Sequence, residues 1–94
     1  MAGVTDYMSR AEILAALAEE SAELAQAALK LRRAATGASP TPVTVEDAWW
    51  QMVEEIADVA CCLDEISGLD WGYIDRLAEA KRQRWISRLT GVGL

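Results

Sequence analysis

Apolar residues recur every three or four positions through three long segments of this chain, and this spacing restricts the fold more than any other feature. In the first segment the recurring side chains are Leu14, Leu17, Leu24 and Leu31, which share one side of a helix. Alanine, the best helix former, is abundant, phenylalanine is absent and β-branched residues are few. The sequence therefore predicts an all-α fold.

Capping and breaking residues set the limits of the predicted helices, which span about 8–35, 44–67 and 71–89. Thr5 or Asp6 is a suitable N-cap for the first helix, and Thr44 opens the second with acidic residues in its first turn. Gly37 suits a helix C-terminus, and the prolines that follow stop any continuation. The segment 36–42 is therefore predicted to be the turn between the first two helices.

The length of the chain predicts one domain, residues 1–94, that is completed by self-association. A single small domain of this size is only marginally stable alone. The first helix is about 42 Å long at 1.5 Å per residue, whereas a compact chain of this length has a radius of gyration near 12 Å. We therefore expect a bundle of three main helices per chain that is completed by dimerisation, as a homodimer or a tetramer.

The charge and hydropathy of the chain exclude several classes of partner. The formal net charge is −6, which disfavours nonspecific binding to nucleic acid or to an anionic membrane. No apolar run approaches about 18 residues, the length that a membrane span needs. The first ten residues lack the basic and apolar regions of a signal peptide. The sequence predicts a cytoplasmic protein without nucleic-acid or membrane partners.

Two acidic motifs are the strongest candidates for function. Glu20 and Glu23 form one pair and Glu55 and Asp58 form the other, each pair three residues apart and therefore on one helix face. If the two helices pack together, four carboxylates converge, and such a cluster needs protons or a metal cation. The ligands are all oxygen atoms and the chain has no histidine, so the fitting cation is Mg²⁺ or Mn²⁺.

Each acidic pair lies on a line of residues beside the main apolar row of its helix. Ala16, Ala27 and Lys30 continue the line of Glu20 and Glu23, and Ala48, Gln51, Cys62 and Glu65 continue that of Glu55 and Asp58. We therefore expect the carboxylates at the border of the packed interface, where a groove can form. Glu19 and Glu54, which precede the motifs, are interpreted as surface or outer residues.

The two motifs, Glu19-Glu20-Ser21-Ala22-Glu23 and Glu54-Glu55-Ile56-Ala57-Asp58, resemble the EExxE and ExxD pattern of the all-α nucleoside triphosphate pyrophosphohydrolases, the MazG-like superfamily. Lys81, Arg84 and Arg88 are similar to the basic positions that follow in many members. The resemblance covers about residues 11–89. The spacer between the motifs is long, and the proline-containing turn accounts for its length.

This resemblance implies an enzyme that cuts a nucleoside triphosphate between its α- and β-phosphates, giving a monophosphate and pyrophosphate. Such enzymes clear surplus or noncanonical nucleotides. Glu20, Glu23, Glu55 and Asp58 would be the catalytic, Mg²⁺-binding residues, with Mn²⁺ as an alternative cation. Without histidine, the general base must be a carboxylate or bulk water, and either Glu20 or Glu23 can serve.

Cationic and aromatic side chains provide candidate contacts for a nucleotide. Lys81, Arg84 and Arg88 follow steps of three and four residues on the third helix, and Lys30 shares a face with the first acidic pair. All four are predicted to bind the phosphates. Trp49, Trp50, Trp71 and Trp85 are available to stack on a base, although core or interface positions suit them as well.

Two other functions are compatible with the same features. One is phosphoribosyl-ATP pyrophosphohydrolase, a related activity with the same fold and acidic helices. The other is a non-catalytic helical dimerisation module whose acidic residues are merely solvated. A module of that kind would show no change in stability when a divalent metal is added. The sequence leaves open the base and sugar preference and the number of metals at the site.

Overall fold

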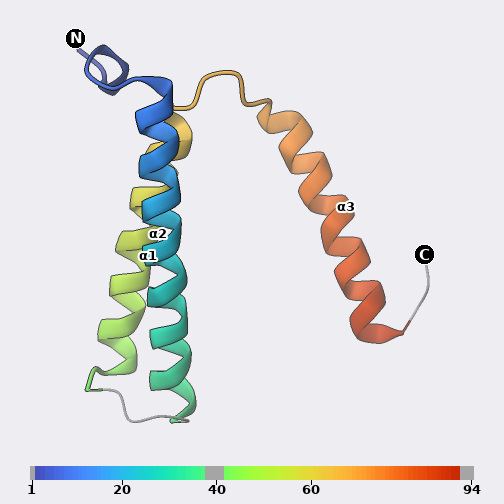
Figure 1. Cartoon of the computed structure of the whole chain (residues 1–94). Helices are drawn as coiled ribbons and strands as arrows, with labels where there is room; N and C mark the ends of the chain where they lie inside the picture. Colours follow the sequence, from blue (N-terminus) through green and yellow to red (C-terminus); the bar gives the residue numbers. More distant parts are fainter. Residues whose placement is uncertain (1, 38–41, 92–94) are drawn as a thin grey trace.

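A computed structural model describes residues 2–37 and 42–91, and every regular element in these two ranges is helical. The elements are a short 3-10 helix, η1 (Val4–Asp6), and three α-helices, α1 (Arg10–Thr36), α2 (Val45–Asp64) and α3 (Trp71–Thr90) (Figure 1). The predicted all-α class and the three main helices are confirmed. Residues 38–41 of the predicted turn lie outside the described residues. None of the helices in the described ranges has the length and apolar character that crossing a membrane requires.

Helix α1 begins at Arg10 because Ser9 caps it in both directions. Ser9 Oγ accepts a hydrogen bond from the Glu12 N–H at 3.1 Å, and Glu12 Oε1 accepts one from the Ser9 N–H at 2.9 Å. The prediction that Thr5 or Asp6 caps this helix was wrong, since both residues belong to η1. The C-terminal end is as predicted, with Gly37 in the left-handed conformation at a φ of 65°.

Side-chain caps also open the other two helices. Thr44 Oγ1 accepts from the Asp47 N–H at 3.0 Å, and Asp70 Oδ1 accepts from the Tyr73 N–H at 3.0 Å. Helix α2 ends at Asp64, three residues before the predicted end. There the Glu65 N–H bonds the Cys62 carbonyl at 3.2 Å, which tightens the last turn before the chain leaves the helix.

Helices α1 and α2 form an antiparallel hairpin and pack along its length (Figure 1). Its most buried residues are Ile13, near the start of α1, and Ala48, near the start of α2, which are 4% and 1% exposed and lie toward opposite ends of the hairpin. The predicted apolar rows are turned partly outward, because Leu14 is 45%, Trp49 49% and Ile56 46% exposed. The most buried residue of each helix therefore lies on the line beside the predicted apolar row and not on that row.

Helix α3 stands away from the hairpin (Figure 1) and packs extensively against neither α1 nor α2. Helix α3 therefore makes few of the apolar contacts expected of a helix in a bundle, and Trp85 and Leu89 are 66% and 75% exposed. The Arg10 guanidinium donates to the Ser67 carbonyl at 2.9 Å, and Gly68 has a φ of 87°, so the α2–α3 connection has a defined turn. The radius of gyration is 17.3 Å, against about 12 Å for a compact domain of this length.

Candidate metal centre

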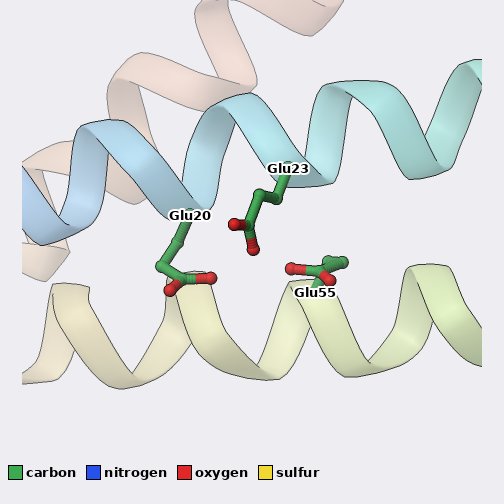
Figure 2. A group of neighbouring side chains, drawn as sticks. All are labelled: Glu20, Glu23 and Glu55. Atoms are coloured by element: carbon green, nitrogen blue, oxygen red, sulfur yellow. The ribbon is translucent and has the colours of Figure 1, made fainter.

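Three of the four predicted metal ligands converge between α1 and α2. Figure 2 shows Glu20 and Glu23 projecting from α1 toward α2, and Glu55 projecting back toward them. Each residue offers one carboxylate oxygen, and these oxygens all lie within 4.8 Å of one another. The expectation that an antiparallel hairpin brings the two acidic motifs opposite each other is confirmed for these three residues.

Heptad spacing explains why glutamates occupy the contact between two packed helices. Ile13, Glu20 and Ala27 are seven residues apart on α1, and Ala48 and Glu55 are seven apart on α2. Seven residues make nearly two helical turns, so each glutamate lies on the same face as the most buried residue of its helix. Glu20 and Glu55 are half-buried as a result, whereas Glu23 is exposed. Glu20 and Glu55 therefore lie within the α1–α2 interface, whereas the sequence had predicted them at its border.

The electrostatics of this cluster are unfavourable for three bare carboxylates. The Oε2 atoms of Glu20 and Glu55 are buried and have no hydrogen-bond partner. Burial raises the pKa of both residues above the ordinary glutamate value, and the negative charges of Glu23 and Asp58 raise it further. Unsatisfied buried oxygens of this kind are costly. Oxygen donors in such a group fit a hard divalent cation such as Mg²⁺ or Mn²⁺.

Asp58, the fourth predicted ligand, is exposed and lies outside the group of three that converge. Its charge nevertheless acts on the pKa of Glu20 and of Glu55, so its carboxylate is near the cluster. The structure therefore places Asp58 at the edge of the candidate site, one turn along α2 from Glu55.

A hollow of about 720 Å³ opens beside the cluster along one side of the hairpin. Its polar lining residues are Glu23, Gln26, Lys30, Arg33, Gln51, Glu54 and Glu55. Lys30 was predicted to contact phosphate, and its Nζ donates to Gln51 Oε1 at 3.3 Å. Arg33 was not predicted, although its position one turn after Lys30 was a usable signal. Glu54, interpreted from the sequence as a surface or outer residue, is exposed but also lines this hollow.

The three predicted phosphate-binding residues of α3 gather at a separate place. Lys81, Arg84 and Arg88 line a second hollow of about 420 Å³ together with Trp85. Because α3 stands away from the hairpin, a single chain does not bring these cations to the carboxylate cluster. The spacing in the sequence predicted that these cations share one face of a helix, but it did not predict their separation from the carboxylates.

Comparison of the chain with protein-family models, with curated proteins and with solved structures found no match. The carboxylate cluster, its neighbouring hollow and the resemblance of the two acidic motifs are therefore the basis for assigning a function.

Proposed function

We propose that this protein hydrolyses a nucleoside triphosphate to the monophosphate and pyrophosphate, with Mg²⁺ held by Glu20, Glu23, Glu55 and Asp58. The observation that carries the proposal is the convergence of Glu20, Glu23 and Glu55, two of which have a buried oxygen without a hydrogen-bond partner. A cluster with no other purpose would be expected to keep its carboxylates apart and solvated.

The cation and the carboxylates have separate tasks in this reaction. When bound, Mg²⁺ supplies positive charge against the phosphate oxygens and makes a water more acidic. The residues hold that ion and exclude bulk water from one side of it. Glu23 is exposed and lines the hollow, so it is better placed than half-buried Glu20 to take a proton from a water there.

The hollow beside the cluster supplies the complementary charge for the remaining phosphates. Lys30 and Arg33 lie on α1 about two and about three turns beyond Glu23, and they line the same hollow as Glu23. A triphosphate tail reaching from the cluster along this side would meet both cations. The hollow can therefore accommodate the leaving pyrophosphate, whose charge needs compensation outside the metal centre.

We propose further that two copies of the hairpin associate through the side opposite this hollow. That side, the apolar edge, is defined by six residues of the predicted apolar rows, none of which lines the hollow: Leu14, Leu17 and Leu24 of α1 and Trp49, Met52 and Ile56 of α2. Two such edges together make the core of a four-helix bundle. The exposure of Leu14, Trp49 and Ile56 favours this arrangement over a monomer.

The direct test is an assay of nucleoside triphosphates and phosphoribosyl-ATP with Mg²⁺, scored separately for pyrophosphate and orthophosphate. Release of pyrophosphate with at least one simple triphosphate is the expected result. Pyrophosphate release from phosphoribosyl-ATP alone would assign the related biosynthetic activity. Release of orthophosphate only, or of neither product from any substrate, would overturn the proposal.

A further inference from the structure

Helix α3 has one face that mixes apolar and cationic side chains and lacks a packing partner in the described chain. This face, here called the arm face, consists of Ile74, Leu77, Lys81, Arg84, Trp85 and Arg88. These residues are exposed, except for Ile74, which is half-buried. Helices in proteins take most of their stability from packing of such a face. The arm face therefore needs a surface to cover it.

The charges of the chain are divided unequally between α3, here called the arm, and the rest of the chain. Helix α3 contains five basic and two acidic residues, a net charge of +3, and residues 1–70 contain four basic and thirteen acidic residues, a net charge of −9. Within the described ranges Lys81, Arg84 and Arg88 have no ion-pair partner, whereas Arg82 pairs with Glu79 on another side of the helix. A complementary surface must therefore offer carboxylates as well as apolar contact.

The hollow beside the metal centre is such a surface. Three carboxylates, Glu23, Glu54 and Glu55, line it together with the cations Lys30 and Arg33, so its lining has a net charge of −1. The exposed side chain of Leu29 adds apolar area. The unpartnered Oε2 atoms of Glu20 and Glu55 lie in the adjacent cluster and increase the negative potential there. Positive side chains arriving at this side of the hairpin would relieve the repulsion among these carboxylates.

The α2–α3 connection directs the arm away from the hairpin of its own chain. Only Ile66, Ser67, Gly68 and Leu69 lie between the Glu65 C-cap and the Asp70 N-cap. Arg10 holds Ser67 through its carbonyl at 2.9 Å and its hydroxyl at 3.2 Å. With so short and anchored a connection, the arm projects outward (Figure 1) and is available to a second copy.

We propose that α3 of one copy docks across the hollow beside the carboxylate cluster of a second copy, reciprocally, so that Lys81, Arg84 and Arg88 complete the partner's site. The assignment of these cations as phosphate contacts rests on the proposed function, whereas the docking itself does not. The reciprocal arrangement explains why the cations and the carboxylates are separated within one chain. It also makes each site incomplete without the other copy.

Zero-length cross-linking of the intact protein tests the docking without any assay of activity. Lys81 is the only lysine of α3, so a carbodiimide link from it to an α1 or α2 carboxylate reports the docked arm. Equal amounts of ¹⁵N-labelled and unlabelled protein are unfolded together, refolded and cross-linked without Mg²⁺. We expect about half of the Lys81 links to join a labelled to an unlabelled peptide, as random reciprocal pairing requires. Links between peptides of like isotope only, or no such link, would overturn the proposal.

Sedimentation equilibrium with matched variants tests the role of the arm face. Lys81→Gln with Arg84→Gln removes two charges from that face, and Arg76→Gln with Arg82→Gln removes the same charge from other sides of α3. The first pair should raise the dissociation constant between copies by at least about tenfold, and the control pair by much less. Equal effects of the two pairs, or a monomer at every concentration, would contradict the docking.

Complementation separates this proposal from the proposed activity. Glu55→Gln impairs the hairpin and Arg84→Ala impairs the arm, so each variant alone should be nearly inactive. After equal amounts of the two variants are mixed and refolded, half of the hairpins are intact, and half of these pair with an intact arm of the other variant. About a quarter of the sites should therefore regain activity. If the wild type is active but the mixture of variants is not, the docking proposal is overturned and the hydrolase proposal stands. If the wild type is inactive but Lys81 links join labelled to unlabelled peptides, the hydrolase proposal is overturned and the docking proposal stands.

Discussion

Glu20 and Glu55 face each other from antiparallel helices, and each has a buried Oε2 atom without a hydrogen-bond partner (Figure 2). Both therefore have a raised pKa, chiefly because of burial and then because of the neighbouring charges. The packing of α1 on α2 consequently depends on what neutralises this pair. Protons and divalent cations are alternative ways to do so, and the two make separate predictions.

Without metal, the free energy of unfolding should increase as the pH falls from 7 toward about 5. The raised pKa values mean that the folded protein binds protons to Glu20 and Glu55 more tightly than the unfolded chain does. The stabilisation is fully present below the glutamate pKa of the unfolded chain, about 4.3, and is lost as the pH rises through the pKa values of the folded protein. Urea denaturation in EDTA at several pH values measures it.

Two other glutamates, Glu12 and Glu79, affect the pH dependence of stability at lower pH and so limit the range in which it reports on Glu20 and Glu55. Glu12 has a lowered pKa because of its hydrogen bonds with Ser9, and Glu79 because of Gln83 and then Arg82. Their stabilisation is lost as the pH falls through their folded pKa values, below the ordinary glutamate range. Between pH 5 and 7 the trend should therefore reflect Glu20 and Glu55, and Glu55→Gln should flatten it. A loss of stability on going from pH 7 to 5 would contradict this account.

Millimolar Mg²⁺ or Mn²⁺ should raise the melting temperature at neutral pH. A ligand that binds only the folded state stabilises it by about 2.7 kcal/mol at 100 times its dissociation constant. Thermal melts with EDTA, with Mg²⁺ and with Mn²⁺ measure the effect, and Glu20→Gln should reduce it. An unchanged midpoint would instead favour the non-catalytic dimerisation module.

Glu55→Gln should abolish most turnover while the protein remains folded. The substitution preserves the shape of the side chain but removes a ligand charge, and loss of repulsion should slightly stabilise the metal-free protein. Asp58→Asn should reduce turnover in the same way, because its charge acts on both Glu20 and Glu55. Pyrophosphate release and far-UV circular dichroism provide the two readouts.

Glu19→Gln is the matched control for these variants, since Glu19 adjoins Glu20 in sequence but is exposed and is not among the three converging residues. It should retain most activity. If Glu19→Gln were as damaging as Glu55→Gln, the assignment of ligands would have to be changed.

Arg33→Gln should lower kcat/KM by roughly tenfold or more while leaving the Mg²⁺-dependent rise in melting temperature intact. Hydrogen bonds to charged groups contribute about 1.5–3 kcal/mol, and Arg33 lines the hollow next to the cluster without being a metal ligand. Arg32→Gln is the control, because Arg32 is adjacent and exposed but does not line that hollow. Equal kinetics for the two variants would remove Arg33 from the site.

Ala48→Leu should destabilise the protein by about 1–3 kcal/mol, because Ala48 is 1% exposed and a larger side chain must push the helices apart. Ala57→Leu makes the same change at an exposed position of α2 and should be nearly neutral. Chemical denaturation of both variants measures the difference. A neutral Ala48→Leu would show that the α1–α2 contact is looser than the structure indicates.

Local signals in the sequence predicted the helices and the meeting of the acidic motifs, because caps, breakers and spacing are local properties. They did not predict which row of each helix faces the other. Periodicity identified the rows containing Leu14 and Ile56, but the most buried residues, Ile13 and Ala48, lie on the neighbouring lines. That choice depends on how two surfaces fit together, which no single segment specifies. The same reason explains why the separation of α3 from the hairpin was not foreseen.

The tryptophans of this chain are placed where they can report its assembly. Trp49 and Trp50 lie at the start of α2, Trp71 and Trp85 lie on α3, and all four are exposed in the single chain. Association through the apolar edge would transfer Trp49 to a dry environment, and docking of the arm would do the same for Trp85. The intrinsic fluorescence of the unlabelled protein should therefore shift to shorter wavelength as its concentration is raised. Single-tryptophan variants would then show which of the two surfaces closes first.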